Sequence, residues 1–137
     1  MNRQDLPQLA EERLLDAQTL LNAGQWSGAY HKAGYTVECA LKACVAKLTR
    51  EHDFPDIDRA RNSYTDNLSS LITTAQLTDE LRTMAQRSSA TYANWVVVKD
   101  WHPRSRYERT SEAKARILLE AITDPAHGVL PWIKKFW

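Results

Sequence analysis

The stretch that decides the fold runs from residue 23 to residue 43 and reads AGQWSGAYHKAGYTVECALKA. From Gln25 to about Arg50, apolar side chains recur every three or four residues, which is the period of one face of an α-helix. Gly28 and Gly34 interrupt this helix, and each costs about 1 kcal/mol relative to alanine there. Close approach of another helix explains such a cost, so we expect tight packing along this surface.

Outward from this helix, the same period predicts further helices separated by polar turns. They span residues 5–23, 68–75, 78–96, 111–122 and 129–136. Gly24 is expected as a left-handed stop, Thr78 as a helix cap and Ser111 as the residue that opens the next helix. Four glycines and five prolines are too few for a many-turned β-fold. The sequence therefore predicts a single all-α domain over residues 1–137, an up-and-down bundle of about five helices plus a short C-terminal helix.

Composition excludes several classes of protein. Hydrophobic residues make up 43% of the 137 residues, which is typical of a globular protein and too high for intrinsic disorder. The longest apolar run, residues 95–98, is far shorter than the ~20 residues of a membrane span. The acidic N-terminus does not resemble a secretory signal, so we expect a cytoplasmic protein that does not enter a membrane.

The net charge of +1 hides one basic segment. Residues 99–116 carry six basic and three acidic side chains, a local charge of +3, with Trp101 and Tyr107 interleaved. Guanidinium groups beside aromatic rings suit phosphates and stacked bases, so Arg104, Arg106 and Tyr107 are candidates for binding a nucleotide or RNA. The alternative is a solvated basic loop held by the acidic segments 5–16 and 53–66.

A polar stripe lies on the long helix. His31, Tyr35, Glu38 and Lys42 are spaced by four, three and four residues and share one face. Glu38 and Lys42 suit an exposed helical ion pair, whereas the whole stripe could instead line a cleft or a dimer interface. For metals the sequence predicts no site, because the four histidines are dispersed and the two cysteines lack neighbouring ligands. No cofactor motif is present either.

The residues 23–43 quoted above resemble the second-helix signature of prokaryotic HEPN domains. In that family a small turn of the type AG-x-W/Y-x-x-A leads into a helix with an A-x-E-x-x-L-K-A core. Residues 64–72 are similar to the family's third-helix start, and Ser105-Arg106-Tyr107 to its Arg-Tyr element. The resemblance implies a helical bundle that usually dimerises and is often encoded beside a minimal nucleotidyltransferase, as a toxin–antitoxin or defence pair.

Many HEPN proteins are metal-independent ribonucleases with an Arg, four to six residues and then a His. None of the four histidines here has an Arg at the required distance before it. In the third-helix start, Asp66 stands where many relatives have a histidine, so an imidazolium role is lost there. The resemblance supports only Glu38, Lys42, Arg106 and Tyr107 as site or interface candidates.

These observations favour a HEPN-like module that homodimerises and binds a nucleotide, RNA or a nucleotidyltransferase partner, without the family's ribonuclease activity. One alternative is a divergent endoribonuclease toxin that uses His102 with the nearby arginines. Another is a structural adaptor whose interface is made by tryptophans. These are Trp26, Trp95, Trp101, Trp132 and Trp137.

Overall fold

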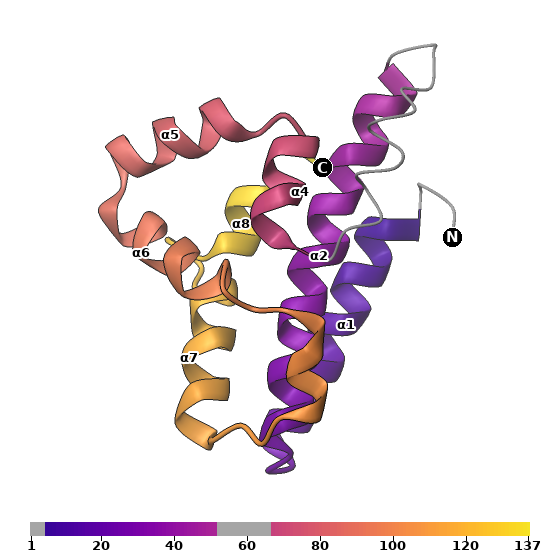
Figure 1. Ribbon diagram of the computed structural model, residues 1–137, viewed down its shortest axis with the longest axis vertical. Coiled ribbons are helices and arrows are strands. Elements are labelled where there is room, and N and C mark those ends of the chain that lie inside the picture. Colours follow the sequence, from indigo (N-terminus) through magenta and orange to yellow (C-terminus); the bar gives the residue numbers. More distant parts are fainter. Residues whose placement is uncertain (1–4, 52–66) are drawn as a thin grey trace.

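The computed structural model describes residues 5–51 and 67–137, and all regular elements in these ranges are helical. In chain order they are α1 (Leu6–Asn22), α2 (Trp26–Glu51), α4 (Leu68–Thr74), α5 (Thr78–Arg87), α6 (Ser89–Val98), the 3₁₀ helix η2 (Pro103–Tyr107), α7 (Glu112–Thr123) and α8 (Val129–Ile133). The predicted all-α bundle is thus confirmed (Figure 1). No helix within these ranges combines the length and apolar character that crossing a membrane requires.

Helices α1 and α2 form an antiparallel hairpin along one side of the molecule (Figure 1). Gly24 ends α1 with a φ of +78°, a left-handed conformation that confirms the predicted stop. Its N–H donates to the carbonyl of Leu21 at 3.1 Å. At Gly28 a Cβ atom would lie 3.2 Å from a methyl group of Leu20, so the expected close approach of another helix occurs here, and that helix is α1.

The core lies where α4, α7 and α8 pack against α2. Burying each large aliphatic side chain contributes about 2 kcal/mol before the entropy of ordering is subtracted. The largest aliphatic side chains that are fully buried come from all of these helices and from α6. They are Val37, Leu41, Leu68, Leu71, Val98, Leu118, Ile122, Val129 and Ile133.

The prediction of one helix over residues 78–96 is wrong, because two helices occupy this span. Ser88 is extended, with φ −144° and ψ 97°, and its hydroxyl accepts a hydrogen bond from the N–H of Thr91 at 3.2 Å. A serine that caps in this way starts a new helix. Thr78 is the first residue of α5 rather than its cap, since Leu77 occupies the cap position.

Two further boundaries test the sequence reading. Ser111 caps α7 as predicted, since its hydroxyl accepts from the N–H of Lys114 at 3.1 Å. The terminal helix was expected to reach Phe136, but α8 ends at Ile133. Residues 134–136 form a turn in which the N–H of Phe136 donates to the carbonyl of Ile133 at 2.9 Å.

Candidate functional site

The basic segment after α6 is held against α2 by Trp101. This side chain is 2% exposed, so although it lies among the basic residues in the sequence, it offers no open face on which a base can stack. A Cβ atom at position 34 would lie 2.1 Å from atoms of the Trp101 indole. Gly34 is therefore required by the approach of an indole, whereas the sequence predicted the approach of another helix.

A hydrogen bond holds the C-terminal end of the basic segment against α2. The N–H of Thr110 donates to the hydroxyl of Ser27, near the start of α2, at 2.9 Å. Between these two attachments the predicted basic loop forms η2, with Pro103 in its first turn. The segment thus crosses α2 as an anchored element.

The cations of η2 point away from the core. Arg104 and Arg106 are exposed, and Tyr107 is 77% exposed, the most of any large apolar or aromatic side chain in the described ranges. The guanidinium carbon of Arg106 lies 4.8 Å from the centre of the Tyr107 ring, a cation–π distance. Within residues 5–51 and 67–137, neither arginine forms an ion pair with a carboxylate.

His31 of α2 lies next to this group. Its ring stacks on Tyr35 with centroids 6.5 Å apart and an interplanar angle of 5°, and it lies 5.9 Å from the Trp101 ring. Burial lowers the pKa of His31, and the positive charges of Lys32 and Arg106 lower it further. The imidazole is therefore neutral at neutral pH. We call the group His31, Arg104, Arg106 and Tyr107 the η2 surface.

The other side of η2 faces a cavity of about 530 Å³, lined among others by Tyr30, His102, Ser105, Glu108 and Lys114. Ser105 is 2% exposed, and neither its hydroxyl nor Nδ1 of His102 has a hydrogen-bond partner in the described part of the chain. Lys114 Nζ lies 5.0 Å from the Tyr30 ring centre. Burial raises the pKa of Tyr30, and the carboxylates of Glu108 and Asp100 raise it further.

The structure divides the predicted site residues between the two sides of η2. His102 lines the cavity, whereas Arg104, Arg106 and Tyr107 are not among its lining residues. A single chain therefore does not bring His102 and these arginines together around one cavity. The sequence reading also missed Ser105, although a serine between two arginines in the Arg-Tyr element was a usable signal.

The remaining stripe residues lie further along α2. Lys42 Nζ is 3.2 Å from Glu38 Oε2, which confirms the predicted pair. The pair is not exposed, however, since Glu38 is 5% exposed and Lys42 is only partly accessible. Burial, with the nearby Cys39 and Glu38, raises the pKa of Tyr35. Asp66 falls outside the described residues.

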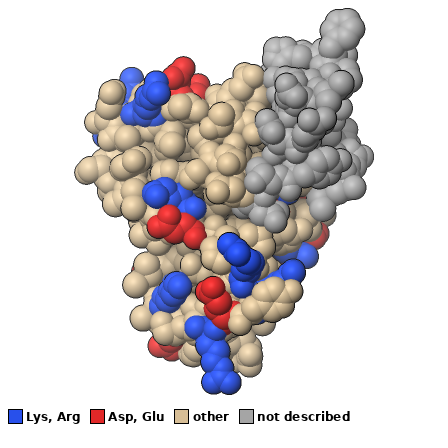
Figure 2. All heavy atoms as spheres, in the orientation of Figure 1, with Lys and Arg blue, Asp and Glu red and all other residues tan. Residues whose placement is uncertain are grey.

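Charges of both signs surround the η2 surface. On the face shown in Figure 2, basic and acidic side chains alternate, and no continuous basic stripe crosses it. The acidic residues of α1 pair elsewhere, Asp16 with Arg13 at 3.0 Å and Glu11 with Lys134. They do not hold the basic segment, and acidic residues 53–66 lie outside the described ranges. Any anion site here is therefore local.

Cysteine and metal chemistry find little support in the described residues. Burial raises the pKa of Cys39 to about 11 and that of Cys44 to about 12, so both thiols stay protonated at neutral pH. Among residues 5–51 and 67–137, no group of three or more His, Cys, Asp or Glu side chains is placed to hold a metal ion.

Comparison with known proteins places this arrangement in a family. No curated protein and no solved structure gives a significant match to the chain. The family model of the HEPN domain matches residues 4–123, which include α1, α2, η2 and α7 and cover most of the chain. Residues 23–43 and the Arg-Tyr element of η2, which suggested this family, both lie within the match. The chain belongs to the HEPN domain family.

Proposed function

We propose that this HEPN domain binds the phosphate groups of RNA or of a nucleotide at the η2 surface and acts as a homodimer. The observation that carries the proposal is the exposed pair of Arg106 and Tyr107, anchored to α2 beside His31. Among the described residues Arg106 has no carboxylate partner, so its guanidinium group can bind phosphate, and the exposed Tyr107 offers a face on which a base can stack.

The same surface lacks the arrangement expected for RNA cleavage. The signature of the family's ribonucleases is an Arg followed by four to six residues and then a His, and this spacing is absent from the chain. His31 carries no positive charge at neutral pH, because its pKa is lowered. It can accept or donate one hydrogen bond, but it is a poor general acid at that pH. We therefore favour binding without cleavage.

The binding test compares two single substitutions with a matched charge change. Arg106→Ala removes a guanidinium from the η2 surface, and Arg82→Ala removes one from α5, where the side chain is exposed and pairs with Asp79 at 3.5 Å. Fluorescence anisotropy with labelled single-stranded RNA measures both. We expect Arg106→Ala, and more strongly Arg104→Ala/Arg106→Ala, to weaken binding about tenfold or more and to reduce its salt dependence.

Equal RNA affinities for Arg106→Ala and Arg82→Ala contradict the proposed surface. The same samples, incubated with RNA in EDTA and run on a gel, test the endoribonuclease alternative. Cleavage by the parent protein that is lost in His102→Ala supports that alternative and contradicts binding without cleavage.

The dimer part of the proposal rests on α6. This helix contains no charged residue, yet Tyr92, Val96 and Val97 are each 40% exposed, and Ile117 of α7 is 54% exposed. A helix that is apolar on more than one face is normally covered. Two copies related by a twofold axis place each surface against itself, so an uncharged surface avoids opposing like charges.

Light scattering measures this directly. We expect a dimer for the parent protein and a monomer for Val96→Glu, because a carboxylate at position 96 is placed in the apolar contact. Thr83→Glu, at an exposed position of α5, is the control and leaves the dimer intact. A monomeric parent protein, or a dimer that tolerates Val96→Glu, contradicts this interface. In the monomeric case, the exposed residues of α6 are free for a nucleotidyltransferase partner.

A further inference from the structure

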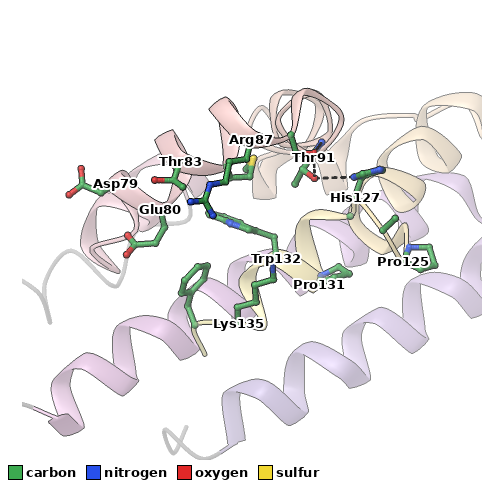
Figure 3. A pocket seen from close by; sticks show the side chains of 15 residues that line it. Asp79, Glu80, Thr83, Arg87, Thr91, Pro125, His127, Pro131, Trp132 and Lys135 are labelled. Carbon is green, nitrogen blue, oxygen red and sulfur yellow. Dashed lines mark hydrogen bonds between the residues drawn. The ribbon is translucent and has the colours of Figure 1, made fainter.

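A large cavity in the described part of the chain lies between α5 and the C-terminal segment, and no residue of η2 lines it. Its volume is about 780 Å³, which is within the range of small-molecule sites. Helix α5 packs against α6, and the space between α5 and α8 stays open (Figure 3). We call this cavity the α5–α8 cleft.

Aromatic and apolar side chains form the floor of the cleft. Trp132 of α8 lies at its centre in Figure 3, and its ring meets that of Phe136 edge to face at 5.5 Å between centroids. Met84 of α5 lines the opposite wall and is 7% exposed. Of these side chains, the Trp132 indole, a residue that is 6% exposed, offers the planar apolar surface on which an aromatic ring can pack.

Cations lie at the rim of this floor. Arg87 points from α5 toward Trp132, and Lys135 reaches in from the other wall (Figure 3). In the described part of the chain, neither side chain forms an ion pair with a carboxylate. Asp79, which pairs with Arg82, and Glu80 also line the cleft, so it carries charges of both signs. Arg87 and Lys135 are the side chains that can bind an anionic group placed over Trp132.

The wall opposite α5 is fixed by a turn that carries His127. The N–H of His127 donates to Asp124 Oδ2 at 2.7 Å, and its carbonyl accepts from Asn94 Nδ2 at 2.9 Å. Its ring nitrogen Nδ1 lies 3.4 Å from the hydroxyl of Thr91. Because these hydrogen bonds are made within the protein, they hold the wall in place, and ligand binding needs little further ordering there.

We propose that the α5–α8 cleft binds a small planar aromatic molecule that carries one anionic group, either a carboxylate or a phosphate. The ring lies on Trp132, and the anion is bound by Arg87 and Lys135. Much of the cleft, residues 125–136, lies beyond the part of the chain that the HEPN family model matches. The site is separate from the η2 surface and does not depend on the function proposed for it.

The test uses two anionic probes with matched neutral analogues. Indoleacetate is compared with indoleacetamide, and adenosine monophosphate with adenosine, so that the carboxylate and phosphate sources are distinguished. The indole N–H resonance of Trp132, assigned with Trp132→Phe, reports occupancy in NMR titrations. We expect at least one anion to shift this resonance and to bind about tenfold more tightly than its neutral analogue.

Arg87 of α5 and Arg116 of α7 provide the matched variants. Arg87→Met, which keeps the aliphatic stem, lowers the affinity of the anion toward that of the neutral analogue. Arg116→Met leaves it unchanged, because neither Arg116 nor its partner Glu112 lines the cleft. Equal binding of anions and neutral analogues overturns the proposal. So does an equal loss in the two variants, or a Trp132 resonance that no probe shifts.

Discussion

The η2 surface and the α5–α8 cleft both present arginines beside aromatic rings, and within the described ranges none of these arginines pairs with a carboxylate, but the two sites are built differently. The η2 surface is exposed to solvent and is made mainly by neighbouring residues of one short helix. The cleft is a concave site made by two segments that are more than 30 residues apart. An exposed surface suits an extended polyanion, which can lie across it, whereas a concave cavity can enclose one small molecule.

Each site depends on one glycine, so a substitution of that glycine is expected to disrupt one site and leave the other intact. Gly34 leaves room for the Trp101 indole that anchors η2, and Gly128 leaves room for the turn that carries His127. The comparison therefore predicts two substitutions with opposite effects on the two sites.

Gly34→Ala has the larger expected effect. The added Cβ would lie 2.1 Å from the indole of a buried tryptophan, so Trp101 must move, and overpacking of this kind costs about 3 kcal/mol of unfolding free energy. Urea denaturation measures this loss. We expect RNA binding to fall with it, while aromatic anions still bind the folded fraction at the cleft.

Gly28→Ala is the control for this change. The nearest atom to its Cβ is a methyl group of Leu20 at 3.2 Å, at the flexible end of a side chain. The better helix propensity of alanine offsets the tight contact, so the unfolding free energy changes by less than about 1 kcal/mol. Equal losses for Gly28→Ala and Gly34→Ala contradict the role of Trp101 as the anchor.

Gly128→Ala is expected to have the next largest effect and the opposite pattern. Its Cβ would lie 2.5 Å from the carbonyl oxygen of Asp124 and 2.6 Å from that of Ile122, so the backbone of the turn must shift. We expect a loss of about 2 kcal/mol in unfolding free energy and weaker binding of aromatic anions. RNA affinity stays unchanged. A variant that keeps its aromatic-anion affinity contradicts the cleft as described.

The sequence predicted the first two helices, the turn between them and the family, because these depend on local signals. The period of residues 25–50, the stop at Gly24 and the cap at Ser111 are each readable from a few neighbouring residues, and the structure agrees with them. The break at Ser88 was missed, because the apolar period continues across it while the serine side chain decides the backbone.

At the candidate sites, too, only residues that are neighbours in the sequence could be predicted. Counting charges found Arg104, Arg106 and Tyr107, since they are consecutive or nearly so, but it misplaced Trp101, which is buried by a contact with Gly34 that lies 67 positions earlier in the numbering. The cleft was missed entirely. Its lining residues meet only after α5, α6 and α8 have packed, and no local pattern in the sequence marks them.

The charge of His31 offers the most direct test of phosphate binding at the η2 surface. Burial, Lys32 and then Arg106 lower its pKa from the ordinary value of about 6.5. Because the folded protein binds this proton less tightly than the unfolded chain, acidification through the ordinary pKa of His destabilises the fold. Arg106→Ala removes one cause, so we expect the pKa of His31 to rise in that variant and to stay unchanged in Arg82→Ala.

The decisive measurement is therefore an NMR pH titration of His31 with and without a short single-stranded RNA at saturating concentration. A phosphate bound at Arg106 brings negative charge close to the imidazole, which favours its protonated form. The account predicts that RNA raises the pKa of His31 and that Arg104→Ala/Arg106→Ala abolishes this rise. Saturation with RNA that leaves the pKa of His31 unchanged contradicts it.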